Sequence, residues 1–459
     1  MAELMLIPTP LAEGVLKTLY IDLASALNVP VVFGYDEKIK VTYAQLNVEP
    51  EILGYALVNV IEKYKDHINE VLSLPLVPLT MRGRGSDAEV MRRKLGFRTA
   101  SKKALYSNLI SIIRQNIKHI GEELLTSNLT INIVGGKYLI KANGDIPSPS
   151  IIENEVFYEL GRFSGFKDLT PRGPPKTGKA SITLSAPIYA LILLAILAYE
   201  VTADDSYILF LTIDYPLSIE IPYRLAQVLI RQREELTYYI KELNIGTYTE
   251  DFDSLRLALL YRIYHNVKKR HGVVKYLDKA SYIFHVIMGG GKRFIKTLEY
   301  IIDLSAIDVL DNGFKTLGIK GYDALRLSRT LSDVLMALIR ASSIIRPTSP
   351  IIEKVKIHLR NLMLGILDAN IPPVLESAYI VSRSLEEKEL GSITCRHLQH
   401  VVDTNIRFES AIEKRNIEDI LADLMKEEDV RAKDKEEFTK IITIKRLNEL
   451  KKVLRVISK

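Results

Sequence analysis

The densest group of side chains that could bind phosphate is a basic segment, residues 81–103. It reads MRGRGSDAEVMRRKLGFRTASKK and carries a net charge of +6, equal to that of the whole chain. Gly83 and Gly85 would let main-chain amides approach phosphates closely, and arginine favours bidentate phosphate contacts. Such a local excess of charge suits a nucleic-acid backbone, whereas the alternative is a solvated loop and helix face. The candidate contacts are Arg82, Arg84, Arg92, Arg93, Lys94, Arg98, Lys102 and Lys103.

Two further groups of cations lie later in the chain. The first contains Arg262, His265, Lys268, Lys269, Arg270, His271 and Lys275. Four of these follow one another directly, so they cannot share one helix face, and a helix C-terminus that attracts cations explains them equally well. The second group is MGGGKRFIK, residues 288–296, where Lys292 and Arg293 follow three glycines. We expect a helix to start there and offer free amides to an anion, with a flexible connection as the alternative.

The segment 173–179, GPPKTGK, matches the first seven positions of a nucleotide-binding P-loop. The eighth position should be Ser or Thr to hold Mg²⁺, but it is Ala180, and no buried strand precedes the segment. The strand-like run YILFLTID, which ends at Asp214, follows too closely for the usual Mg²⁺-ordering Asp. We therefore predict a basic loop that contacts a nucleic-acid duplex or backbone through Arg172, Lys176 and Lys179. A mobile surface loop with incidental charge is the alternative.

Other catalytic and metal-binding patterns are incomplete. Cys395, His397, His400 and Asp403 lie close together in TCRHLQHVVD, but the spacing is not HExxH, and histidines on a polar helix surface explain it more simply. The single cysteine excludes an intramolecular disulfide and a Cys-based zinc ribbon. No GxSxG elbow and no His-Asp pair occur. We therefore predict neither a catalytic residue nor a cofactor, and scattered carboxylates that bind a metal remain an open alternative.

The elements that would position these residues begin with an α+β part, residues 1–150. Alternating and β-branched runs predict two hairpins, and apolar residues at helical spacing predict two long helices. Two adjacent glycines, Gly135 and Gly136, suit the tight turn of the second hairpin. The predicted hairpins join Val29–Phe33 to Ile39–Tyr43 and Leu129–Val134 to Lys137–Lys141, and the predicted helices are Glu51–Leu72 and Ala104–Leu125.

A central part, residues 151–249, contains the basic loop, an apolar helix, a strand at Tyr207–Ile213 and a helix opened by Pro222. The apolar stretch Ala186–Tyr199 has fourteen residues without a charge. A bilayer requires about 20 apolar residues, so we expect a buried helix and no membrane contact.

Residues 250–459 predict a helical bundle, because several segments carry an apolar face at helical spacing. Ser349 and Pro350 form a clear helix start. The fold class is therefore an α+β N-terminal part followed by a mostly α-helical bundle, with helix dominating overall. The predicted helices are Phe252–Lys269, Lys292–Leu304, Tyr322–Ile345, Ile351–Leu367, Pro373–Ser384, Ala411–Lys426 and Lys433–Val456.

The composition limits the class of protein. Apolar residues make up 47% of the 459, which excludes general disorder and provides for two or three domains. The N-terminus has no basic region before an apolar stretch, so we expect no signal peptide and a reducing, cytoplasmic location. Many Ile, Lys, Arg and Glu residues, with no Trp, suit a thermophilic source.

This layout resembles the large subunit of archaeal type I-A CRISPR interference complexes. The resemblance rests on the basic loops of the α+β part, the long helical part and the central segment PRGPPKTGKASITLSAPIYALILLAILAYE. It implies a non-catalytic subunit whose partners are guide RNA, target DNA and other subunits of the complex. Such a subunit helps to recognise the target duplex and to hold the displaced strand, while guide pairing reads the sequence.

Two other classes of function stay open on the sequence alone. One is an enzyme, either a nucleotide hydrolase or a metal-dependent phosphodiesterase with dispersed ligands. The other is a helical adaptor protein that uses the bundle for protein contacts. Magnesium-dependent turnover would favour the enzyme, and absence of polyanion binding would favour the adaptor.

Overall fold

The computed structural model divides the chain into two compact units, which we call unit 1 and unit 2. Unit 1 contains Met1–Arg233 and Ala280–Ile301, and unit 2 contains Glu234–Lys279 and Ile302–Lys459. The structure describes residues 2–37, 41–74, 76–81, 86–98, 101–134, 137–152, 180–203, 207–242, 252–270, 275–290, 293–344, 350–413 and 415–458.

The first sheet of unit 1 has the strand order β1-β3-β2-β10. The predicted hairpin is confirmed, because β2 (Val31–Asp36) pairs antiparallel with β3 (Val41–Leu46). The outer strands are β1 (Ala2–Met5) and the short β10 (Glu220–Ile221). The helix α1 (Pro10–Leu27) starts with a proline and ends at Asn28, which adopts a left-handed conformation.

The second sheet has the order β12-β11-β9-β8 and contains a correction to the sequence prediction. Residues 293–303 form a strand, β12 (Arg293–Asp303), where we predicted the helix Lys292–Leu304. The strand β11 (Ser281–Gly290) precedes it and pairs with β9 (Tyr207–Asp214), which also pairs with β8 (Glu200–Ala203). Aromatic and β-branched residues such as Phe294, Ile295 and Thr297 favour a strand once such a partner exists.

The third sheet has the order β4-β5-β7-β6, and the predicted central basic loop lies between its strands β6 and β7 in the sequence. The strands β4 (Leu129–Val134) and β5 (Lys137–Ala142) form the predicted antiparallel hairpin. β7 (Ala180–Leu184) runs parallel to β5 and antiparallel to β6 (Ile146–Pro147). The chain therefore leaves this sheet after β6 and returns to it at β7.

The helices of unit 1 pack around α9 (Ala186–Tyr199), whose residues from Pro187 to Tyr199 are all buried. Ser185 caps its first turn by accepting a hydrogen bond from the Ile188 amide, and the predicted buried helix is confirmed. Among the described residues, every helix is too short or too polar to cross a membrane. The other helices in this part are α2 (Pro50–Lys63), α3 (Lys65–Ser73), α4 (Asp87–Lys94), α5 (Lys102–Gln115), α6 (Ile120–Glu123) and the 3₁₀ turn η1 (Thr126–Asn128).

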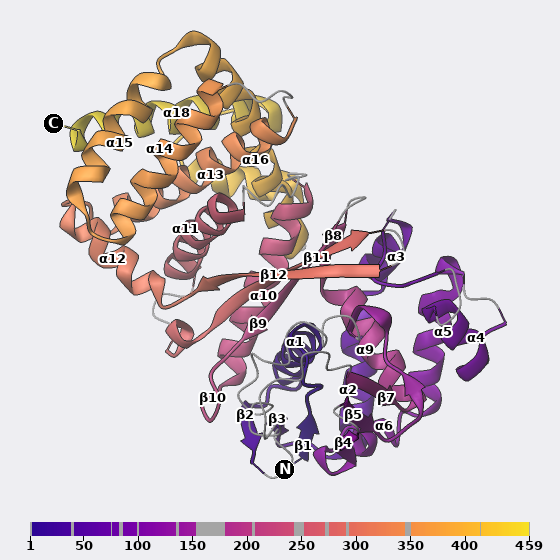
Figure 1. The fold of residues 1–459 in the computed structure, drawn as a ribbon. Helices are drawn as coiled ribbons and strands as arrows, with labels where there is room; N and C mark the ends of the chain where they lie inside the picture. The colour runs from indigo at the N-terminus through magenta and orange to yellow at the C-terminus, as the bar shows by residue number, and fades with distance from the viewer. Residues whose placement is uncertain are drawn as a thin grey trace. The chain divides into compact units, whose positions relative to one another are not determined.

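Unit 2 is helical, as Figure 1 shows, and its helices α14 and α15 lie side by side. The predicted fold class, an α+β part followed by a helical bundle, is confirmed. The helix α10 (Tyr223–Glu242) begins in unit 1 and ends in unit 2. Unit 2 further contains η3 (Leu277–Lys279), α11 (Phe252–Arg270), α12 (Ala306–Thr316), α13 (Tyr322–Ile344), α14 (Pro350–Leu367), α15 (Ile371–Ser384), α16 (Lys388–Glu413), α17 (Ile417–Glu427) and α18 (Lys435–Ile457).

Candidate nucleic-acid interface

The helix α4 forms where the basic segment changes from acidic to basic residues. Ser86 caps its N-terminus by accepting a hydrogen bond from the Glu89 amide at 3.3 Å. Asp87 and Glu89 lie in the first turn, whereas Arg92, Arg93 and Lys94 lie in the last turn. Both arrangements complement the helix dipole, so the cations collect at the C-terminal end of α4.

Asp87 fixes this helix in place from inside the fold. The residue is 2% exposed, and its carboxylate accepts hydrogen bonds from the Thr80 amide at 2.7 Å, the Thr80 hydroxyl at 2.9 Å and the Ser150 amide at 2.9 Å. The Ser150 hydroxyl donates a fourth bond. Four donors compensate the buried charge well, and this acid does not reach the surface to neutralise the neighbouring cations.

Five cations of the basic segment are exposed, and we call them the α4–α5 patch: Arg92, Arg93, Lys94, Arg98 and Lys103. Lys102 is half-buried, and its ammonium donates to the Leu74 carbonyl at 2.8 Å. Burial lowers the pKa of Lys102, with Glu200 opposing the shift. Lys102 therefore links the start of α5 to the Leu74 carbonyl, while the other five side chains reach solvent.

Only two members of the α4–α5 patch form ion pairs within the described residues. Arg93 pairs with Glu89 at 2.8 Å, and Lys94 pairs with Asp145 at 2.8 Å. The hydrogen bond and charge of Lys94 lower the pKa of Asp145. Exposed ion pairs of this kind are weak, so both cations can exchange to a phosphate. Arg92, Arg98 and Lys103 have no acidic partner in this part of the structure.

Five further predicted contacts in unit 1 fall outside the described residues: Arg82, Arg84, Arg172, Lys176 and Lys179. The residues that flank 153–179 on either side are described. The Ser148 amide donates to the Ile182 carbonyl at 2.9 Å, and Ser150 is bonded to Asp87, the first residue of α4. Ser150, which precedes residues 153–179, is thus bonded to the helix that carries part of the α4–α5 patch.

The geometry after Lys179 differs from that of a P-loop. A P-loop leads directly into a helix, whereas the strand β7 begins at Ala180. Asp214, at the end of β9, pairs with Lys17 of α1 at 2.7 Å, and Lys17 also lies 3.1 Å from Glu13. Asp214 therefore ties a strand to a helix in this structure.

The second group of cations lies in the last turns of α11, which ends at Arg270 as the helix-terminus alternative requires. Lys268 pairs with Asp311 at 2.7 Å, and Lys269 pairs with both oxygens of Glu427 at 2.7 Å. Arg262 and His265 are buried in unit 2 and cannot reach a backbone phosphate. The side chain of Arg270 lies outside the described part, and Lys268 and Lys269 stay predictions as contacts.

The third group lies at a strand, so the predicted anion site at a helix start is wrong in its geometry. β12 begins at Arg293, and β11 ends at Gly290. Lys292 lies outside the described residues, as does the side chain of Arg293.

The histidines of α16 contact other helices of unit 2: His397 lies beside Arg340 of α13, and His400 Nε2 lies 3.3 Å from the Glu242 carbonyl of α10. His397 is 6% exposed, which corrects the predicted surface position, and its Nδ1 lies 3.1 Å from Arg340 Nη1. Burial, followed by the charge of Arg340, lowers the pKa of His397 to about 4. Asp403 pairs with Arg407 at 3.0 Å. In the described ranges, no three His, Cys, Asp or Glu side chains gather as metal ligands.

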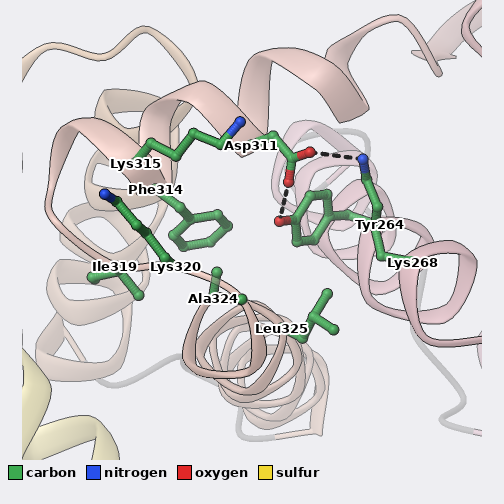
Figure 2. Close-up of a pocket in the computed structure, with 10 residues that line it drawn as sticks. Tyr264, Lys268, Asp311, Phe314, Lys315, Ile319, Lys320, Ala324 and Leu325 are labelled. Atoms are coloured by element: carbon green, nitrogen blue, oxygen red, sulfur yellow. Dashed lines mark hydrogen bonds and ion pairs between the residues drawn. The ribbon is translucent and has the colours of Figure 1, made fainter. Parts of the chain in front are cut away.

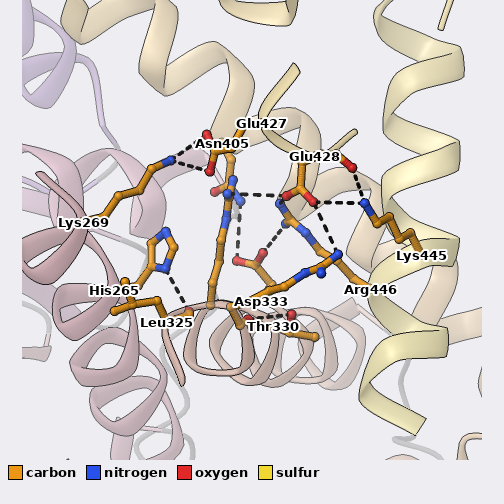
Figure 3. Close-up of polar contacts among 12 residues, drawn as sticks. His265, Lys269, Leu325, Thr330, Asp333, Asn405, Glu427, Glu428, Lys445 and Arg446 are labelled. Carbon is orange, nitrogen blue, oxygen red and sulfur yellow. Dashed lines mark hydrogen bonds and ion pairs between the residues drawn. The ribbon is translucent and has the colours of Figure 1, made fainter. Parts of the chain in front are cut away.

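A buried ionic cluster in unit 2 is absent from the sequence predictions (Figure 3). Asp333 of α13 is fully buried and contacts Arg262 Nη1 at 3.2 Å and Arg446 of α18. Arg446 also lies 3.3 Å from Glu428. Burial opposes the charge on Arg262, but Tyr239, Asp333 and Glu235 outweigh it and raise its pKa. The one available signal was an acid within the apolar run LSDVLMALI.

Comparison of the chain with protein-family models, with curated proteins and with solved structures finds no match. Its function is therefore inferred from its own residues.

Proposed function

We propose that this chain binds nucleic acid through the α4–α5 patch, without catalysing a reaction, as a subunit of a CRISPR interference ribonucleoprotein. The observation that supports the proposal most is the separation of charge around α4. Asp87 is buried and accepts four hydrogen bonds, while Arg92, Arg98 and Lys103 are exposed and have no acidic partner in the described structure.

The physics of such a patch favours a polyphosphate backbone. Each cation that neutralises a phosphate releases condensed counterions, so affinity depends strongly on salt. Arginine offers two parallel donors to one phosphate. Contacts of this kind position a strand but carry no direct sequence information. This suits a complex in which guide RNA pairs with target DNA and the protein recognises shape and charge.

Binding is tested with the purified protein and labelled single-stranded RNA, single-stranded DNA and duplex DNA of unrelated sequence. Fluorescence anisotropy should report binding to all three, with affinity that falls steeply as salt rises. Incubation with Mg²⁺ should leave the nucleic acids and added ATP intact. Absence of binding at low salt, or Mg²⁺-dependent cleavage or hydrolysis by the pure protein, would contradict the proposal.

The assignment to a ribonucleoprotein needs a separate experiment. The tagged chain is recovered from cells of its source, and the RNA that accompanies it is sequenced. We expect short RNAs that share a constant, repeat-derived end, together with other protein subunits. Recovery of the chain without such RNA would contradict the assignment but leave the binding activity in place.

A further inference from the structure

Unit 2 contains a cavity of about 350 Å³ between α11, α12 and the start of α13 (Figure 2). This volume lies within the range of small-molecule sites, about 300–1,000 Å³. Its apolar lining includes Phe314 and Ile319 on one side and Ala324 and Leu325 of α13 on another. The cavity also has a polar lining, which consists of a carboxylate and three lysines.

The carboxylate of Asp311 lies at one edge of this cavity, held by two donors from α11. It accepts a hydrogen bond from the Tyr264 hydroxyl at 2.6 Å and one from the Lys268 ammonium at 2.7 Å (Figure 2). Burial opposes its charge, but the bonds from Lys268 and Tyr264 lower the pKa of Asp311. An ionised carboxylate has about four acceptor positions, so two remain for donors on a ligand.

Positive charge remains in excess around this cavity. Lys315 and Lys320 are exposed, and neither forms an ion pair within the described residues. Lys268 is already paired with Asp311 and lies 3.8 Å from Asp308. The lining therefore leaves two lysines available for an anion, beside an apolar wall and a fixed acceptor.

We propose that this cavity binds a nucleoside monophosphate, either free or as the terminal nucleotide of a strand. The base lies against the apolar wall and directs its amino group toward Asp311, while the phosphate contacts Lys315 and Lys320. A ligand of this class has three features: a planar apolar ring, N–H donors and an anionic group. The lining offers a partner for each, namely the apolar wall, the Asp311 carboxylate and the two lysines. The site is separate from the α4–α5 patch and goes beyond the proposed function.

The first test measures binding of AMP, CMP and GMP to the full chain by calorimetry. We expect one site per chain, with adenosine alone and inorganic phosphate alone at least about tenfold weaker, because each lacks one end of the recognition. The double variant that carries Lys315→Ala and Lys320→Ala should bind nucleotide about tenfold more weakly, or weaker still. Lys354→Ala, a change at an exposed lysine on α14, serves as the control and should have no effect.

The second test fills the cavity without changing its charge. Ala324→Leu puts a larger side chain at a position that is 3% exposed and should block the nucleotide while leaving polynucleotide binding by unit 1 unchanged. Nucleotide binding that survives both Ala324→Leu and the double lysine change would overturn the proposal, as would no binding at millimolar nucleotide. If Ala324→Leu unfolds the protein, the double lysine variant decides alone.

The source of the nucleotide is distinguished in a protein whose α4–α5 patch is reversed to glutamate. General strand binding is then removed, so any remaining preference belongs to the cavity. Displacement of AMP by an oligonucleotide with a 5′-phosphate, but not by one with a 5′-hydroxyl, would assign the site to strand ends. Displacement by neither would assign it to free nucleotide.

Discussion

Asp87 and Ser150 lie 63 residues apart in the sequence, and the Asp87 carboxylate accepts a hydrogen bond from the Ser150 amide at 2.9 Å. Asp87 is the first residue of α4, and Ser150 precedes the central basic loop. One buried acid thus bonds the start of α4 to a residue that precedes the predicted central basic loop.

Asp87→Asn should loosen α4, because an amide places a donor where the fold supplies only donors. We expect a loss of about 1–3 kcal/mol in the local stability of α4. Hydrogen–deuterium exchange in peptides from residues 86–94 measures this directly. The exposed Asp66→Asn on α3 is the control. Unchanged exchange in α4 would show that the four hydrogen bonds do not hold the helix.

Arg446→Met should destabilise unit 2 strongly. The change leaves Asp333 buried with one cation, Arg262, in place of two, and breaking a buried ion pair costs about 3–5 kcal/mol. Denaturant unfolding followed by circular dichroism measures the effect. Arg431→Met, at an exposed arginine, should change stability by less than about 0.5 kcal/mol. Equal effects of the two changes would refute a structural role for the cluster.

The buried His285 should make stability depend on pH below neutrality. Its Nε2 lies 2.9 Å from the Thr212 hydroxyl, and burial lowers its pKa to about 4, with Asp214 opposing. The unfolded chain binds the proton at about pH 6.5, above the folded value. The contribution of neutral His285 to the unfolding free energy is therefore fully present above about pH 6.5. It is lost as the pH drops toward 4, by at most about 3 kcal/mol.

The variant His285→Gln tests this dependence, because it removes the titrating group from the folded core. Its unfolding free energy, measured from pH 4 to pH 7, should vary less with pH than that of the wild type. Part of the dependence should persist from His265, His397 and His400, because burial also lowers the pKa of each of these histidines. Parallel curves for variant and wild type would exclude His285 as a source of the pH dependence.

Local signals predicted the elements whose partners are close in sequence. The hairpins of β2 with β3 and of β4 with β5 follow from alternating residues beside turn residues, and α9 from its capping Ser185 and apolar run. β12 was predicted as a helix although its neighbour in the sheet, β11, directly precedes it; β11 in turn pairs with β9, far earlier along the chain. Tertiary pairing overrode the local pattern there.

The candidate site was predictable only in part for the same reason. The cations of α4 were visible as a dense run, but nothing local showed that Asp87 would be buried by Ser150. Likewise, Lys269 resembled a free cation because its partner, Glu427, is 158 residues away. The sequence shows how many charged residues a segment contains, whereas the charge of a surface depends on which of those residues form ion pairs in the fold.

The most direct test of the account is the salt dependence of binding after reversal of the three unpaired cations, Arg92→Glu, Arg98→Glu and Lys103→Glu. The control reverses three exposed cations of unit 2 that lack ion pairs in the described structure, Lys354→Glu, Arg431→Glu and Lys452→Glu. Both proteins change net charge equally. The slope of log affinity against log salt should shrink by about 0.7–0.9 for each lost phosphate contact in the first variant and stay near the wild-type value in the control. A wild-type slope in the first variant, or an equal reduction in both, would contradict binding at the α4–α5 patch.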